Sequence, residues 1–258
     1  MRPRAKNDYR ARGFAALIDA YTKRRNATTG SSERVLRKLL NGYEERLSAW
    51  RKSEETSASD FNLLETLNIA RDEIRHSRML AWLLDYRIEG AGTHAQGKLG
   101  FSLFLQKLGL NMGYAKANYF VSREVKGNSS RVDVEISAIG QFIIHLENKI
   151  FSEEATNQAD REDQTVREWR DLQRRAGHLR VKREHVHGFF VTLLGDKPSS
   201  EHFIPITWHQ LADVFDEFAE QAKPAQVSLF AKHYAKALRW VTQQIAPYEQ
   251  DEQREDSP

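Results

Sequence analysis

Residues 131–149, RVDVEISAIGQFIIHLENK, indicate two β-strands joined by a turn at residues 139–141. The runs on either side of the turn are short, rich in Val and Ile and alternating in polarity, and the turn contains a glycine. Side chains two residues apart lie on the same face of a strand. The first strand therefore has an apolar face and a charged face that includes Asp133, and the second strand carries Glu147 and Lys149 on one face.

A hairpin of this kind can bring Asp133 beside Glu147 and Lys149, so that two carboxylates and a lysine converge on one side of a sheet. Carboxylate oxygens suit a divalent metal ion, and Lys149 can orient or deprotonate a bound water molecule. The alternative is a solvated charged face, because an Asp followed fourteen positions later by Glu-X-Lys is a loose pattern. Both interpretations stay open on spacing alone.

The overall composition is that of a globular protein, with 29% charged and 40% hydrophobic residues in 258. This length suits one substantial domain with appendages. We expect no membrane span, because no apolar run is long enough to cross a bilayer. The chain has no cysteine, which excludes disulfides, thiolate metal sites and a cysteine nucleophile, and a reducing cytoplasm is the expected location.

Positive charge is concentrated near the N-terminus. Residues 1–52 contain 14 Lys and Arg against 5 Asp and Glu, an excess of nine, whereas the net charge of the whole chain is only +3. Helices are expected at about residues 9–25 and 32–52, followed by a polar joint at residues 53–60. This basic region is compatible with binding to a phosphate backbone, and equally with a helix pair that has a cationic outer face.

A further helix is expected over residues 61–86, where Glu73, His76 and Leu80 fall on one face. An acid aligned with an apolar stripe is unusual, because burying a carboxylate is costly unless it is paired or bound to a metal. Glu73 is therefore a candidate for the metal site, and a pairing with His76 or with an arginine such as Arg75 is the alternative.

The remaining pattern predicts a mixed α/β fold in which the acids lie on the second and third of three consecutive strands. The other expected elements are a helix at 97–109, a strand at 119–125, a polar helix at 153–175, strands at 186–194 and 203–207, and closing helices at 208–222 and 225–245.

The order of these elements, with Asp133 and then Glu147-Asn148-Lys149, resembles the PD-(D/E)XK nuclease superfamily. The segments EIRHSRMLAWLLDY, RVDVEI and LENKI look like a bacterial branch of it, and the resemblance spans about residues 61–215. It implies an α/β nuclease core of a helix, three antiparallel strands, a helix and a strand, with added N- and C-terminal helices. Val132 stands where the proline of the superfamily name would be, which removes no ligand.

By this resemblance, Asp133 and Glu147 would be direct metal ligands, with the Asn148 carbonyl oxygen as a candidate third. Lys149 would orient the attacking water and stabilise developing charge. Glu73 would hold a metal-bound water or a second metal ion.

The family also tends to place a glutamine on the helix after the Glu-X-Lys strand, and Gln164 in EDQT fits that motif best. Helical phase gives a different indication, because it brings Gln158 closer than Gln164 to the expected inward face. The residues taken to define that face are Ala155, Ala159, Val166 and Trp169.

The resemblance implies a nuclease that hydrolyses phosphodiester bonds, with DNA as the favoured substrate and Mg²⁺ as the cofactor, for which Mn²⁺ could substitute. Family habit adds a role in bacterial defence against foreign DNA. The alternatives are a non-cleaving nucleic-acid-binding module and a partner-binding subunit of a larger defence complex, and self-association stays open. The predicted domains are a basic helical region at 1–60, a nuclease core at 61–210, C-terminal helices packed on it at 211–246 and a disordered acidic tail at 247–258.

Overall fold

The computed structural model describes residues 16–20, 31–58, 61–68, 72–150, 156–157 and 162–255. The chain divides into two compact units, Met1–Phe61 and Asn62–Pro258. In the first unit, residues 16–20 are helical and α2 (Ser31–Ser57) is a long amphipathic helix. Among the described residues, no helix is both long enough and apolar enough to cross a membrane.

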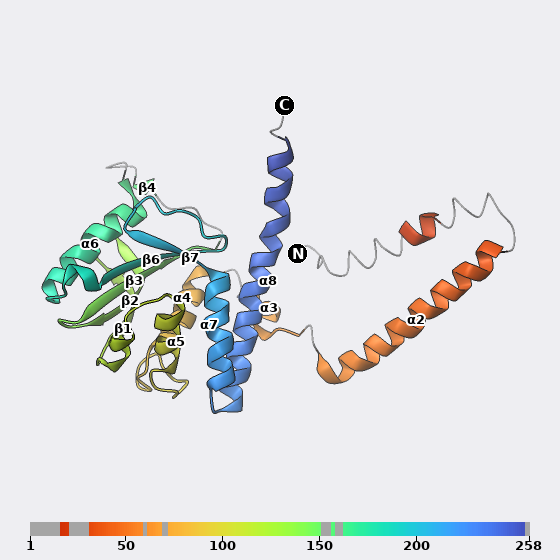
Figure 1. The fold of residues 1–258 in the computed structure, drawn as a ribbon, viewed down its shortest axis with the longest axis horizontal. Coiled ribbons are helices and arrows are strands. Elements are labelled where there is room, and N and C mark those ends of the chain that lie inside the picture. Colours follow the sequence, from red (N-terminus) through yellow and green to blue (C-terminus); the bar gives the residue numbers. More distant parts are fainter. Residues whose placement is uncertain are drawn as a thin grey trace. The chain divides into compact units, whose positions relative to one another are not determined.

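The second unit is built on a five-stranded sheet with the strand order β1-β2-β3-β6-β7 (Figure 1). Strand β2 is antiparallel to both of its neighbours, β1 and β3, and β6 and β7 run parallel to β3. The predicted hairpin is β2–β3, and Gly140 in its turn has a φ of +70°, a conformation that glycine adopts without strain. The bounds are β1 Phe120–Lys126, β2 Arg131–Ala138, β3 Phe142–Asn148, β6 Val186–Thr192 and β7 Phe203–Thr207.

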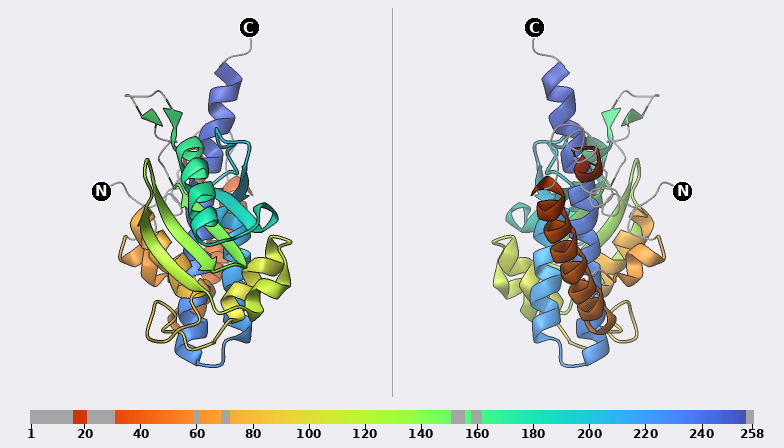
Figure 2. Two further views of the ribbon diagram at one scale, coloured as in Figure 1. Left: turned by 90° about the vertical axis from the view of Figure 1, so that its left-hand side faces the viewer. Right: turned by 90° about the vertical axis from the view of Figure 1, so that its right-hand side faces the viewer.

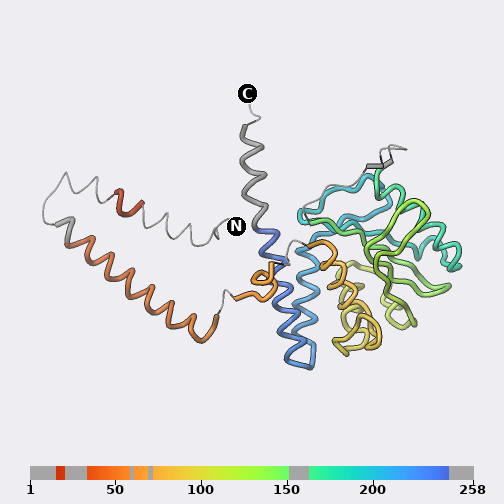
Figure 3. Tube along the Cα trace, turned by 180° about the vertical axis from the view of Figure 1, so that it is seen from behind, coloured from red at the N-terminus to blue at the C-terminus, as the bar shows by residue number. Residues whose placement is uncertain are grey.

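Helices cover both faces of this sheet, which confirms the predicted α/β class (Figure 2). The large core lies between one face and four helices, of which α7 and α8 run side by side (Figure 3). These four are α4 (Glu73–Leu84), α5 (Leu99–Lys107), α7 (Trp208–Gln221) and α8 (Ala225–Glu255). The other face is covered by α6 (Gln164–His178) over a small core of Ile143, Leu172, Ala176 and Val181. Short elements complete the unit: α3 (Leu63–Thr66), η1 (Met112–Lys116) and η2 (Arg183–His185).

Helix α6 begins at Gln164, eleven residues after the predicted start at 153. Before it, β4 (Thr156–Asn157) pairs with β5 (Glu162–Asp163), and Asp163 occupies the N-cap position. Thr, Asn and Asp are poor helix formers that favour caps and turns, which accounts for the late start. Residues 151–155 and 158–161, and with them Gln158, lie outside the described residues.

Helix α8 extends to Glu255 and so includes residues 247–255. Its Glu, Gln and Arg residues are good helix formers and continue a helix that has already started. Residues 256–258 lie outside the described part of the chain.

Asp171 attaches α6 to the loop between β1 and β2. Its carboxylate accepts hydrogen bonds from the Ser129 amide at 2.9 Å and from the Ser130 hydroxyl at 2.8 Å. Burial acts to raise the pKa of Asp171, but the hydrogen bonds from this loop outweigh burial and lower the pKa below its usual value. The ionised carboxylate therefore stabilises the position of α6 on the sheet.

We expect Asp171→Asn to lower the free energy of unfolding by about 1–3 kcal/mol at pH 7, because the loop donors lose a charged acceptor. An acid whose pKa is lowered by folding contributes stability that is complete above its unfolded pKa, near 3.8, and is lost as the pH falls below it. The difference between wild type and variant should therefore shrink towards pH 3. Urea unfolding at pH 7 and pH 3 measures this, with the exposed Asp196→Asn as the control; equal effects of the two substitutions would contradict it.

Candidate active site

Asp133 and Glu147 lie on neighbouring antiparallel strands at the end of β3. The register pairs Val134 with Leu146, and one step further along it brings Asp133 and Glu147 opposite each other. Lys149 follows directly after β3. Its backbone amide donates to the Val191 carbonyl at 2.7 Å, and its carbonyl accepts from the Trp208 indole at 3.0 Å, so the main chain here is held on two sides.

Glu147 is almost completely buried, with 2% of its surface exposed. Its Oε1 atom accepts from the Lys149 ammonium at 3.1 Å and from the Gln164 amide at 2.5 Å. Its Oε2 atom is buried and has no donor among the described residues. Burial first, and then the charge of Asp133, raise the pKa of Glu147 to about 8.

Asp133 is held by the residue that follows Glu147. One carboxylate oxygen accepts from both the backbone amide of Asn148, at 2.9 Å, and its side-chain amide, at 2.5 Å. Burial raises the pKa of Asp133 to about 6, although Asn148 and the charge of Lys149 oppose this change. For Lys149 itself, burial acts to lower the pKa, but Glu147 outweighs burial and raises it, so the ammonium stays protonated at neutral pH.

Asn148 connects this pair of acids to α4. Its side chain points to the opposite face of β3 from Glu147, and its amide donates to the Ser77 hydroxyl at 2.9 Å. Ser77 lies on the buried face of α4. The Asn148 side chain thus fixes both Asp133 and the helix that carries Glu73.

Glu73 is the first residue of α4, directly after the N-cap residue Asp72. Its Oε1 atom accepts from the Ile150 amide at 3.0 Å, which places it beside the chain that leaves β3. Its negative charge acts on both Asp133 and Lys149. Of the partners considered in the sequence, Arg75 pairs with Asp72 at 3.0 Å, and the His76 ring contacts the Tyr234 hydroxyl at 2.6 Å.

Helix α6 brings Gln164 to the acids, and with it a residue that the sequence analysis missed. Glu168 lies one turn after Gln164, has 0% of its surface exposed, and accepts from the Gln164 amide at 2.8 Å. The sequence does contain an indication of this contact, because a spacing of four residues puts the side chains of Gln164 and Glu168 on one helix face. It was missed because the expected inward face was defined by Val166 and Trp169.

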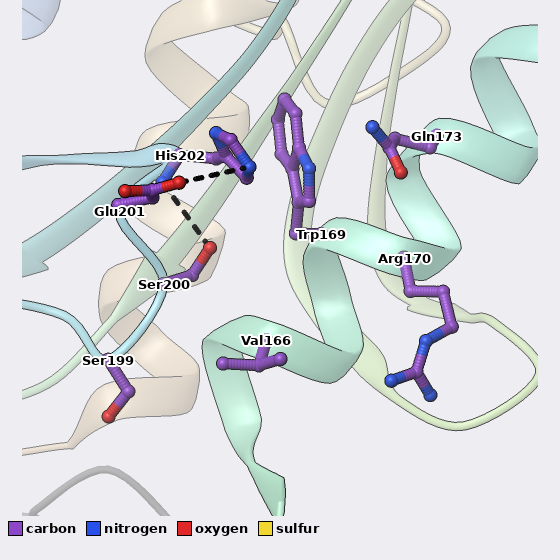
Figure 4. A pocket seen from close by; sticks show the side chains of 8 residues that line it. All are labelled: Val166, Trp169, Arg170, Gln173, Ser199, Ser200, Glu201 and His202. Atoms are coloured by element: carbon purple, nitrogen blue, oxygen red, sulfur yellow. Dashed lines mark hydrogen bonds and ion pairs between the residues drawn. The ribbon is translucent and has the colours of Figure 1, made fainter.

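Val166 and Trp169 line a hollow of about 350 Å³ beside α6, together with the loop that ends at His202 (Figure 4). The Trp169 indole stacks on the His202 ring, with 4.6 Å between ring centroids. Trp169 is half-buried and also packs against the small core under α6, so it lies in part on the inward side, as expected. The buried residues of α6 are Thr165, Arg167, Glu168, Asp171, Leu172 and Ala176.

Glu135, which lies on the same face of β2 as Asp133, shows by comparison how weakly the charges of Asp133 and Glu147 are compensated. Glu135 is also buried, but it accepts from the Arg175 guanidinium at 2.7 Å and from the His145 ring at 3.1 Å. Burial opposes ionisation here too, yet these two partners lower the pKa of Glu135 to about 2. Asp133 and Glu147 are less well compensated, so they form neither a solvated face nor a simple structural ion pair.

This donor set suits a hard divalent cation, because two incompletely compensated carboxylates lie together and one oxygen of Glu147 is buried without a donor among the described residues. Three or more His, Cys, Asp or Glu side chains do not converge into a metal-binding group anywhere in the part of the chain that is described. A cation here would therefore be held by the pair of acids together with main-chain or water oxygens.

A mixed sheet with paired acids and a lysine at the end of two adjacent strands defines a nuclease-like class of α/β protein. The family model of the PD-(D/E)XK nuclease superfamily matches residues 61–236, and the chain belongs to this superfamily. Members of the superfamily are nucleases that typically use divalent metals. Comparisons with curated proteins and with solved structures give no match.

Proposed function

We propose that this protein is a metal-dependent nuclease that hydrolyses phosphodiester bonds, with DNA as the favoured substrate and Mg²⁺ as the cofactor, replaceable by Mn²⁺. The observation that carries the proposal is the convergence of Asp133, Glu147 and Lys149 at the end of β3: a half-buried and a buried acid, both of raised pKa, with one ammonium beside them. Membership of a nuclease superfamily supports it.

In this proposal Asp133 and Glu147 hold the cation, with the Asn148 carbonyl as a third ligand. The cation would supply positive charge that stabilises the negative charge on the phosphate oxygens while the phosphodiester bond is broken. Lys149 keeps its proton, since its pKa is raised, and so acts as a donor that orients the attacking water and stabilises developing charge. This favours the orienting role over deprotonation by Lys149.

Gln164 and Glu73 complete the proposed site from two helices. Gln164 fixes one oxygen of Glu147 and leaves the other oxygen available. Glu73 adds negative charge beside Asp133 and Lys149, consistent with holding a water molecule or a second cation. DNA as substrate, bacterial defence as the setting and the cytoplasm as the location are further parts of the proposal, and they rest on the family and on composition.

The direct test is to incubate the full-length protein with plasmid DNA, single-stranded DNA and RNA in Mg²⁺, Mn²⁺ or EDTA. We expect plasmid cleavage in either metal and none in EDTA. Cleavage of RNA alone would change the substrate but keep the chemistry. Binding of all three nucleic acids without cleavage in either metal would favour the non-cleaving module instead.

Glu73→Gln tests the contribution of α4. The carboxamide oxygen can still accept from the Ile150 amide, so the free energy of unfolding should change by less than about 0.5 kcal/mol. Loss of the charge should lower the cleavage rate about 10- to 100-fold and raise the Mg²⁺ concentration that is needed. Cleavage rates over a series of Mg²⁺ concentrations, with thermal unfolding of the metal-free protein, measure both. A large fall in melting temperature with unchanged metal dependence would assign Glu73 a structural role.

A further inference from the structure

The environment of Glu168 is not explained by packing alone. It is fully buried in the face of α6 that covers the sheet, beside Gln164 and Glu147, and it feels the negative charges of Glu147 and Asp133. A glutamate in such a position destabilises the fold unless it is neutral or has a specific partner. An apolar side chain of similar size would fill the same space without this cost.

The contacts of Gln164 suggest what the acid does. Its amide nitrogen carries two hydrogens, and the structure directs this nitrogen at two acceptors, Glu147 Oε1 at 2.5 Å and Glu168 Oε1 at 2.8 Å. With both hydrogens engaged, the amide has one orientation, and it presents its nitrogen to Glu147. Glu168 thus fixes Gln164, and Gln164 fixes Glu147.

The second oxygens of the two glutamates complete the arrangement. Glu147 Oε2 and Glu168 Oε2 are both buried, and neither has a donor among the described residues. Gln164 therefore holds Glu147 by its Oε1 atom, and Glu147 Oε2 stays available to the cation.

We propose that Glu168 is a positioning residue of the nuclease site, which acts through Gln164 to hold the Glu147 carboxylate in the orientation that receives the cation. This inference rests on the proposed function. The role needs an oxygen that accepts from the Gln164 amide, and it does not need a negative charge. The side-chain carbonyl of a glutamine at this position supplies that acceptor, with nearly the same shape as glutamate.

The test compares Glu168→Gln with Glu168→Ala in the full-length protein. Glu168→Gln should keep Mn²⁺ affinity, measured by calorimetry, within about threefold of wild type, whereas Glu168→Ala should lose about 10- to 100-fold in affinity and in cleavage rate. The melting temperature of the metal-free Glu168→Gln protein should equal or exceed that of wild type, since a buried acid is gone. Gln173→Ala, on the exposed side of the same helix, is the matched control and should change none of these quantities.

A double-mutant cycle separates action through Gln164 from direct contact with the cation. If Glu168 acts through Gln164, then Gln164→Ala should cost about as much Mn²⁺ affinity as Glu168→Ala, and the double variant no more than either alone. An equal loss of affinity in Glu168→Gln and Glu168→Ala would overturn the proposal, as would unchanged affinity in Glu168→Ala. Failure of the wild-type protein itself to bind Mn²⁺ or to cleave would instead count against the proposed function.

Discussion

Lys149→Ala is expected to abolish cleavage while the protein still binds its divalent metal. The ammonium is a donor 3.1 Å from Glu147 and is not a metal ligand, so its removal takes away the group that orients water and stabilises charge. The rate should fall by at least about 10²–10³-fold. Affinity for Mn²⁺ should stay the same or rise, because a positive charge next to the cation has been removed. Calorimetric titration with Mn²⁺ beside a plasmid cleavage assay measures the two effects separately.

Lys182→Ala, at an exposed position in the same unit, is the control for general loss of positive charge. If the protein binds DNA as proposed, both variants should bind it in EDTA about as well as wild type, since each removes one of 39 Lys and Arg residues. Wild-type cleavage by Lys149→Ala would show that the β2–β3 hairpin is not the catalytic centre. Loss of metal binding in this variant would mean that Lys149 organises the acids and does not act on the water.

Asp133→Asn is also expected to lose cleavage, but unlike Lys149→Ala it should lose metal binding as well. The amide oxygen can still accept from Asn148, so the local structure is kept, but one charged ligand of a hard cation is gone. The loss of cleavage should be as complete as for Lys149→Ala. Mn²⁺ affinity should fall with it, and this fall distinguishes the two variants in the same titration.

The same substitution should stabilise the metal-free protein at alkaline pH. Folding raises the pKa of Asp133 from 3.8 to about 6, so the ionised side chain destabilises the fold above pH 6. This destabilisation is absent below the unfolded pKa of 3.8, where the acid is protonated in both states. The melting temperature of Asp133→Asn should therefore exceed that of wild type at pH 8 and converge with it near pH 4. A lower melting temperature at pH 8 would mean that the carboxylate stabilises the fold.

The hairpin could be predicted from the sequence because its information is local. A period of two residues in β2 and β3 decides which side chains share a face, and a glycine turn sets the register that brings Asp133 opposite Glu147. The start of α7 also agrees with the predicted start at 208, and in the structure Thr207 and Gln210 form a capping box there.

The contribution of α6 could not be predicted in the same way. Its inward face is set by packing of Leu172 on Ile143, a contact between distant parts of the chain, and by a start at Gln164 that the polar sequence does not mark clearly. The expected inward face was defined by Ala155, Ala159, Val166 and Trp169, and Glu168 was hidden among the charged residues of a polar helix. Whether a charged residue is buried depends on what packs over it, and sequence periodicity alone does not contain that information.

The central strand β3, buried at all seven positions, has a consequence for how this protein can evolve. Its apolar residues are needed for the fold, whereas the acids around its end cost stability in the metal-free state. Replacement of Asp133, Glu147 or Glu168 by an uncharged residue would therefore be expected to stabilise the metal-free protein and leave the fold intact. A lineage released from selection for catalysis would be expected to lose these acids early.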